Sequence, residues 1–550
     1  MTTDRLDCIV IGYNDLDFDQ VAAHAEATQQ QSPIYSELKR SSVRFRGKRR
    51  PYMGLMNAAL EAVTGTSPDL HVCELPSLGV AYLTSYLRKR GYTADYVNFY
   101  SAEQDRLKEL LAARPRSVAI TTTFYVDNAP IVDIAAFVRQ HSPETKIIVG
   151  GPHIYNICEA VDERAQDYLF GSIGADVFVF DSQGETTLGR LMEKLRAGDD
   201  DLSDVPNLIW TRDGKKFEHT TRAIEDNDMD ENVIDWSQFP SDFYAPTVQL
   251  RTARSCAFKC AFCRYPAVGG ALKLNAVDVV MEQLRAVRDA GAKHVVFIDD
   301  TFNVPLPRFK QLCRQMIEED LGLSWYSYFR CSNSDPEAID LMADAGCKGV
   351  FLGIESGDER VLVNMDKRAT LDKYRTGIKQ LNERGIATFA SFIIGYPGET
   401  EETVSNTIAF LEETKPMFFS TGVFFYDNKA PVAKRAEEFG LKGGGFNWRH
   451  ATMDWKQAVA QADRLYRSVK GSTILPTFMF DFWSIPYLAG MGFEIEQIHG
   501  FAKIAQKMLL RGLDDDKADL PELERELIAY LGNGGAPQSL KVGAAAEPRG

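Results

Sequence analysis

The stretch TVQLRTARSCAFKCAFC, residues 247–263, decides how the second half of this 550-residue chain is interpreted. It opens with an apolar run typical of a buried strand. Cys256, Cys260 and Cys263 follow, separated by three residues and then by two. A structural zinc knuckle, a disulfide cluster and an iron–sulfur cluster left one ligand short would each concentrate cysteines in this way.

Strand and helix patterns alternate from this stretch onward. We predict strands at 247–253, 294–300, 324–330, 349–356, 387–395 and 420–427, and helices at 276–291, 307–320, 335–346, 370–385 and 400–414. Units of this kind predict right-handed crossovers between parallel strands. The expected fold of residues 246–430 is a partial (β/α)6 barrel of the TIM type, with the cysteines at the C-terminal mouth of its first strand, where such folds carry their chemistry.

The surroundings of the cysteines favour the iron–sulfur cluster. Zinc normally takes four protein ligands as two separated pairs, and no second Cys or His pair follows at that spacing. A disulfide would leave one cysteine of the three unpaired. Three thiolates on a [4Fe–4S] cluster leave one iron open to an external ligand, which suits the spacing best.

The first third of the chain also has an α/β pattern. We predict strands at 7–13, 93–100, 117–124, 146–153 and just after residue 175, with helices at 77–92, 130–143 and before residue 195. This predicts a doubly wound, Rossmann-like domain over residues 1–210, which binds its ligand beyond the C-terminal ends of the strands. Small, hydroxyl and glycine residues gather at those ends and let backbone amides approach a large ligand. The candidate contacts are Thr122, Thr123, Phe124, Gly150, Gly151, Pro152, His153, Gly184 and Glu185.

The remaining segments divide into a linker and a C-terminal region. Residues 211–245 are charged and are expected to be a linker with one hairpin at Asp213-Gly214. Residues 431–550 are expected to form a mainly helical substrate or lid domain with a disordered tail from 533. Tyr426, Trp448, Arg449, His450 and Trp455 are lid candidates, although aromatic packing would explain them equally well.

Composition limits the classes of partner. The net charge of −15 argues against nucleic acid, and the basic run 39–50 is expected to be a solvated surface loop, with a polyanion site as the alternative. The longest apolar windows are too short to span a membrane, and no secretory signal pattern is present. Nine cysteines, an odd number, indicate a reduced, cytoplasmic protein, which we expect to be a monomer.

The cysteine spacing, with Phe262 before the last cysteine, resembles the signature of the radical S-adenosylmethionine (SAM) superfamily. The resemblance implies that SAM chelates the open iron of a [4Fe–4S] cluster through its amino and carboxylate groups. Carboxylates and arginine at the ends of buried strands are costly unless they bind something, which supports the same assignment. The implied contacts are Phe262 near adenine, Asp299 and Asp300 toward the amino group, Arg330 toward the carboxylate, Glu355 and Ser356 toward ribose or methionine, and Gly395, Tyr396 and Pro397 toward adenine.

The glycine turns GGPH (150–153) and QGET (183–186) resemble the cobalamin-binding domain of B12-dependent radical SAM enzymes. The resemblance covers about residues 75–430. One feature departs from the Asp-x-His-x-x-Gly motif of cobalamin proteins: the nearest string, 69–74, has Glu74 where the glycine belongs. His71 is therefore not expected to be the lower axial ligand of cobalt, and His153 is the better contact, to the corrin edge.

This resemblance implies methyl transfer from SAM, through methylcobalamin, to an unactivated carbon or phosphorus of a small natural-product-type substrate, with a flavodoxin- or ferredoxin-like electron donor. The opening strand resembles branches that act on phosphinates or tryptophan. Cyclisation or ring rearrangement without methyl transfer is an alternative. A tRNA methylthiotransferase with a second cluster on Cys8, Cys73 and Cys158 is another, opposed by the charge of −15, and a cobalamin sensor is a third.

Overall fold

The computed structural model describes residues 5–15, 18–27, 33–476, 480–518 and 520–540. The chain forms two compact units, of which the first comprises Met1–Leu16 and Cys73–Tyr244 and the second Asp17–Val72 and Ala245–Gly550. These boundaries differ from the predicted ones. The described residues between 18 and 72 group with the second unit, 211–244 belong to the first instead of forming a separate linker, and the described residues between 431 and 540 do not separate from the barrel.

The first unit is the predicted doubly wound α/β domain. Its sheet has the order β4-β1-β5-β6-β7-β8-β9, in which the first five strands are parallel. Taken in chain order these five read 2-1-3-4-5, the flavodoxin-like order, so the direction of winding reverses between β1 and β5. The strands are β1 (Cys8–Tyr13), β4 (Ala94–Phe99), β5 (Ser117–Thr121), β6 (Lys146–Gly150) and β7 (Val177–Val179), and the helices are α4 (Leu78–Lys89), α5 (Gln104–Ala112), α6 (Ala129–His141), α7 (Pro152–Ala160), α8 (Glu163–Ile173) and α9 (Glu185–Ala197).

The segment expected to be a linker completes this sheet. Strands β8 (Leu208–Thr211) and β9 (Phe217–His219) are antiparallel and are joined at Asp213-Gly214, which confirms the predicted hairpin. The Asp213 carboxylate accepts hydrogen bonds from the backbone N–H groups of Lys215 and Lys216, at 2.9 and 3.0 Å. The linker prediction was wrong because these two short strands pair their backbone hydrogen-bonding groups by extending the edge of the sheet.

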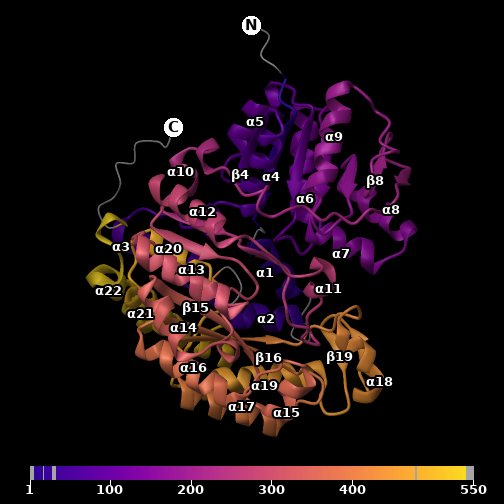
Figure 1. Ribbon diagram of the computed structural model, residues 1–550. Coiled ribbons are helices and arrows are strands. Elements are labelled where there is room, and N and C mark those ends of the chain that lie inside the picture. Colours follow the sequence, from indigo (N-terminus) through magenta and orange to yellow (C-terminus); the bar gives the residue numbers. More distant parts are fainter. Residues whose placement is uncertain (1–4, 16–17, 28–32, 477–479, 519, 541–550) are drawn as a thin grey trace. The chain divides into compact units, whose positions relative to one another are not determined.

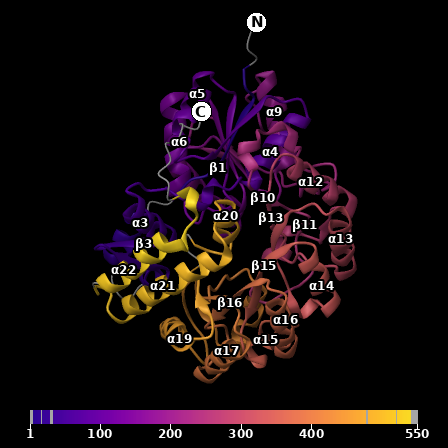
Figure 2. The same cartoon turned by 90° about the vertical axis from the view of Figure 1, so that its left-hand side faces the viewer.

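The second unit contains the predicted partial barrel. Its seven strands are parallel and follow the chain in the order β10-β13-β14-β15-β16-β17-β20. Figures 1 and 2 show helices along one side of these strands. The strands are β10 (Thr247–Leu250), β13 (His294–Phe297), β14 (Ser324–Tyr328), β15 (Cys347–Glu355), β16 (Ala387–Ile394), β17 (Phe418–Val423) and β20 (Thr473–Ile474), and the helices are α12 (Val277–Asp289), α13 (Leu306–Glu319), α14 (Pro336–Asp344), α15 (Glu359–Asn364), α16 (Leu371–Glu383) and α17 (Glu401–Thr414).

The two faces of the barrel strands differ in exposure. In β15, Val350, Leu352 and Ile354 are fully buried, whereas Phe351 and Gly353 keep accessible surface. Successive side chains of a strand point to opposite faces, so one face is sealed by helices and the other is less completely filled.

The basic run 39–50 is not a solvated loop. It forms the end of α2 (Pro33–Ser41) and the hairpin β2 (Ser42–Phe45) and β3 (Lys48–Pro51). Arg40 is buried and pairs with Glu37 at 2.9 Å and with Asp463 at 3.3 Å. Arg49 is buried as well and pairs with Glu26 and Asp516. Buried cations need such partners, so these carboxylates already neutralise two of the arginines that a polyanion would have bound.

The C-terminal region is mainly helical, as predicted, with α19 (Trp455–Ser468), α20 (Ser484–Gly490), α21 (Ile495–Asp514) and α22 (Pro521–Tyr530). Disorder was expected from residue 533, but short helical turns continue through Leu540, and residues 541–550 lie outside the described residues. No helix within the described part of the chain combines the length and apolar character that crossing a bilayer requires.

Candidate active site

The three motif cysteines lie on one loop of the second unit. The loop follows β11 (Ala253–Arg254) and turns at Ser255, whose φ of 71° is left-handed. Cys260 is buried, Cys256 and Cys263 are half-buried, and all three thiols are free. Burial, together with the nearby Cys260, Asp300 and Cys256, raises the pKa of the Cys263 thiol to about 11. The three thiols therefore lie within electrostatic reach of one another.

This donor set suits a cluster better than a single ion. Among the described residues, no three Cys, His, Asp or Glu side chains surround a position for one metal ion. A [4Fe–4S] cluster instead takes each thiolate on a different iron. Three thiols on one sheltered loop therefore fit a cluster with one open iron, and Cys256, Cys260 and Cys263 remain its predicted ligands.

Asp299 and Asp300, predicted together as SAM contacts, have different surroundings. The carboxylate of Asp299 is buried and accepts hydrogen bonds from the backbone N–H groups of Thr252 and Ala253, at 2.7 and 2.9 Å, and from the Thr252 hydroxyl at 2.6 Å. Asp299 thus anchors the chain that leads into the cysteine loop. Asp300 keeps an accessible side chain, yet the protein atoms around it desolvate the carboxyl and raise its pKa to about 7.

Buried charges surround the cysteine loop. The Arg330 guanidinium lies 3.9 Å from the Cys260 Sγ and 3.6 Å from the centre of the Phe258 ring, and it donates to the backbone oxygen of Lys367. The Lys367 Nζ pairs with Glu355 at 2.9 Å.

The Lys367 ammonium also lies 5.5 Å from the Phe262 ring centre. The structure thus brings the predicted Phe262, Arg330 and Glu355 together with Phe258 and Lys367, which were missed. Phe258 lies inside the cysteine motif, so its position in the sequence could have identified it as a site residue. Lys367 follows a turn whose position relative to the cysteine loop the sequence alone does not give.

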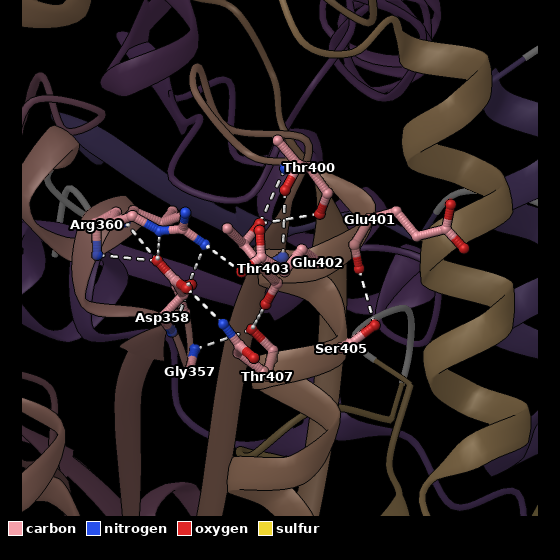
Figure 3. A network of polar contacts seen from close by, with 12 residues as sticks. Gly357, Asp358, Arg360, Thr400, Glu401, Glu402, Thr403, Ser405 and Thr407 are labelled. Carbon is pink, nitrogen blue, oxygen red and sulfur yellow. Dashed lines mark hydrogen bonds and ion pairs between the residues drawn. The ribbon is translucent and has the colours of Figure 1, made fainter.

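The turn after β15 is tied to the middle of α17, as Figure 3 shows. The backbone N–H of Gly357 donates to the Thr407 hydroxyl at 3.0 Å, and Asn406 donates to the Asp358 carboxylate at 2.7 Å. Ser356 is buried, and its hydroxyl accepts from the backbone N–H of Asp358 at 3.2 Å. These bonds hold Glu355, which has a left-handed φ of 70°, in place beside the cysteine loop.

The predicted adenine segment, Gly395–Pro397, is held from behind. Gly395 has φ of 89°, and a Cβ there would lie 2.5 Å from the Trp448 ring and 2.6 Å from Ala458. His450 donates to the Gly395 carbonyl at 3.1 Å and stacks on Trp448. Tyr396 is fully buried, and the Pro397 carbonyl accepts from Asn364 at 3.2 Å. Trp448 and His450, proposed as lid residues, are therefore packed behind this segment.

In the first unit, hydrogen bonds join the predicted residues after β5 to those at the end of β6. The buried Thr122 hydroxyl donates to the Gly150 carbonyl at 3.0 Å and accepts from the backbone N–H of His153 at 3.3 Å. Gly151 has φ of 112° and precedes Pro152, the first residue of α7. The His153 ring bonds Asn128 at 2.8 Å, and burial lowers its pKa, which keeps the ring neutral.

Apolar side chains remain exposed beside this turn, at the point where the winding reverses. Phe124 is 56% exposed and contacts Tyr13, while Val126 is 79% exposed and Thr123 is exposed as well. A flat ligand with apolar faces and polar edges, such as a corrin, fits such a surface next to backbone amides.

The start of α9 contributes a polar rim. Gly184 has φ of 86°, and the buried Glu185 accepts from Asn227 at 3.2 Å. Glu225 accepts from the backbone N–H groups of Thr186 and Thr187, both at 2.8 Å, and so caps the helix. Glu225 and Asn227 were missed because that segment was expected to be a linker. His71 belongs to the second unit, where its backbone N–H donates to Tyr487.

Comparison with known proteins gives a family match in each of the two units. The Radical SAM superfamily matches residues 250–411, and the B12 binding domain matches residues 73–179. An uncharacterized methyltransferase of Pyrococcus horikoshii is 27% identical over 367 residues, 65% of this chain and 76% of that protein. The anaerobic magnesium-protoporphyrin IX monomethyl ester cyclase of Rubrivivax gelatinosus is 23% identical over 62% of each chain. The solved structure of TsrM, a radical SAM methyltransferase from Kitasatospora setae, has a TM-score of 0.60 at 18% identity and covers 82% of this chain and 98% of its own.

Together the fold, the cysteine loop and the two matched domains define a radical SAM protein that also carries a B12-binding domain. The chain is thus a cobalamin-dependent radical SAM enzyme, and its cofactors are a [4Fe–4S] cluster, SAM and cobalamin. The resemblance identified from the cysteine motif and the glycine turns is confirmed.

Proposed function

We propose that the enzyme transfers a methyl group from SAM, by way of methylcobalamin, to an unactivated carbon or a phosphorus atom of a small natural-product-type substrate. The observation that carries this proposal is the presence, in one chain, of the sheltered three-thiol loop and the exposed apolar surface at the winding reversal of the B12-binding unit. The similarity to an archaeal methyltransferase and to the fold of TsrM supports it.

The residues of the second unit have defined tasks in this proposal. When bound, the cofactors supply reductive cleavage of SAM and a transferable methyl group. Arg330 and Lys367 place positive charge where the SAM carboxylate would bind, and Glu355 offers a carboxylate to an amino or hydroxyl group. Because these charges are buried, their interactions with a ligand are stronger than in water.

The partners belong to the same proposal. Electrons would come from an external flavodoxin- or ferredoxin-like protein. The nine free cysteines suit a reducing cytoplasm, and the net charge of −15 suits a monomer that does not bind nucleic acid.

Cobalamin-assisted cyclisation or ring rearrangement without methyl transfer is a second candidate. It is supported by the similarity to the Rubrivivax gelatinosus cyclase, which covers 62% of each chain. The two candidates differ in their products, because only methyl transfer converts SAM to S-adenosylhomocysteine.

The test begins with anaerobically reconstituted protein. We expect a corrinoid spectrum and about four iron atoms per chain. Cys260→Ala should lose the iron and keep the corrinoid, whereas Cys313→Ala, which removes a buried cysteine of α13 outside the motif, should keep both. With a candidate substrate, 5′-deoxyadenosine and S-adenosylhomocysteine should form together. The first product without the second would favour cyclisation, and iron for two clusters without corrinoid would overturn both candidates.

A further inference from the structure

One segment of the C-terminal region lies against the barrel strands. We call residues Phe480–Ser484 the inner segment. The Phe482 ring is buried and contacts aromatic rings from three neighbouring strands, β14, β15 and β16. Its partners, at ring-centre distances of 5.9 to 6.4 Å, are Tyr326, Tyr328, Phe351 and Phe389. The inner segment is therefore packed on the face of the barrel to which Tyr328 belongs.

This aromatic group is not sealed. Tyr328, Phe351 and Trp483 keep accessible surface, whereas Phe389 and Phe482 of the same group are buried. Trp483 meets Tyr328 edge-on, with ring centres 5.6 Å apart. Accessible aromatic rings on a buried aromatic base are typical of a site that binds a flat apolar group.

A carboxylate lies on the same segment. Asp481 accepts hydrogen bonds from the backbone N–H groups of Trp483, at 3.0 Å, and Ser484. No cationic side chain of the described residues is among its interaction partners. The Asp481 side chain keeps some accessible surface, but the surrounding protein desolvates it and raises its pKa to about 7. A desolvated carboxylate without a cation is costly, and a ligand cation would relieve that cost.

Electrostatic contacts link this group to the cysteine loop. Besides burial, the charges of Asp481 and Asp300 both raise the pKa of the Tyr328 hydroxyl. Short contacts give the same link: the backbone N–H of Phe302 donates to the Tyr328 carbonyl at 3.2 Å, and the hydroxyl of the adjacent Thr301 lies 3.5 Å from the Sγ of Cys256, one of the predicted cluster ligands. The inner segment thus lies near the place where the proposed reaction occurs.

We infer that Asp481, Trp483 and Tyr328 form the substrate-binding end of the active site and select a substrate that carries a protonated amino group on an aromatic or other flat apolar body. The assignment to substrate rests on the proposed function. The binding preference itself rests only on the aromatic rings and the carboxylate.

A purely structural role for Asp481 makes a different prediction. Its bonds to Trp483 and Ser484 form a turn at the start of α20, and an asparagine would form that turn equally well. Asp481→Asn therefore removes the charge and keeps the turn, which separates the two roles.

The experiment uses equilibrium dialysis to measure the affinity of the enzyme for three probes. Each probe has the same phenyl ring but a different charge: 2-phenylethylamine is a cation, 2-phenylethanol is neutral and 3-phenylpropionate is an anion. We expect the reconstituted enzyme to bind the amine at least about tenfold more tightly than the acid. Asp481→Asn should abolish that preference, and Trp483→Ala should weaken all three probes. Glu383→Gln, which removes an exposed carboxylate from α16, should change nothing.

Two results would overturn the inference: wild-type enzyme that binds none of the probes or shows no charge preference, or Asp481→Asn enzyme that keeps the preference. The proposed function fails separately. A lack of S-adenosylhomocysteine would reject methyl transfer and leave the binding preference standing, whereas a lost preference would leave methyl transfer untouched.

Discussion

Glu399 gives the second unit a stability that depends on pH. Its side chain is fully buried behind Gly395, whose backbone N–H donates to one carboxyl oxygen, while the other oxygen has no hydrogen-bond partner among the described residues. Burial raises the Glu399 pKa from 4.5 to about 8, although the backbone bonds partly oppose it. The carboxyl is therefore largely protonated in the folded protein at neutral pH.

The sign and size of the effect follow from linkage. A carboxyl whose pKa is raised on folding binds its proton more tightly in the folded state, so the folded state loses stability as pH rises between the two pKa values. With pKa values of about 4.5 unfolded and 8 folded, this group alone removes about 2 kcal/mol between pH 6 and pH 8. Glu399→Gln has no such proton to lose, so its free energy of unfolding should lack that component.

The assay is urea unfolding of wild type and Glu399→Gln at pH 6, 7 and 8 without SAM. Glutamine shifts stability by an amount that does not vary with pH, so the informative quantity is the change with pH in the difference between the two proteins. Glu402→Gln, which removes an exposed carboxylate three residues further along, in the first turn of α17, is the control and should follow wild type. If the difference between wild type and Glu399→Gln stays constant within about 0.5 kcal/mol from pH 6 to pH 8, the assignment of a protonated Glu399 is refuted.

Two further predictions address one unit each. Asp299→Ala removes the acceptor of three hydrogen bonds that anchor the chain before the cysteine loop. We expect the free energy of unfolding to fall by about 3 kcal/mol and the reconstituted iron to fall by at least half, and Asp299→Asn should restore most of both. Full iron in the alanine variant would show that the loop does not depend on this anchor. Gly151→Ala forces a Cβ to 2.9 Å from the Thr122 hydroxyl at φ of 112°, so bound corrinoid measured by absorbance should fall while iron is retained. Gly198→Ala, whose Cβ would meet nothing within 4 Å, should keep its corrinoid.

The strands and helices could be predicted because local sequence decides them. Parallel strands covered by helices are continuous apolar runs, and β16 shows one such run within a residue of its predicted ends. The helix that follows begins where Thr400 caps it, and it was predicted one residue early. The two residues of β20 were missed because so short a strand has no period of its own.

The domain boundaries could not be predicted because they depend on contacts between distant residues. Arg40 pairs with Asp463 and Arg49 with Asp516, across more than 400 positions of sequence. Surface and buried arginines have the same local sequence pattern, so a basic run is predicted to be a solvated loop unless its distant acidic partners are known. The same reasoning applies to Glu225, which caps α9 from a segment that looks like a linker.

The paired carboxylates Asp299 and Asp300 show where sequence reasoning about the site has to stop. Both follow β13 and both match the polar position of the family, so sequence gives them one role. The structure gives the two carboxylates different surroundings, however, and the sequence does not show this difference. Asp299 is buried against Thr252 and Ala253, and Asp300 keeps its accessible surface near Cys263. The division of tasks follows: Asp299 sets the position of the cysteine loop, and Asp300 is the carboxylate that remains available to a bound molecule.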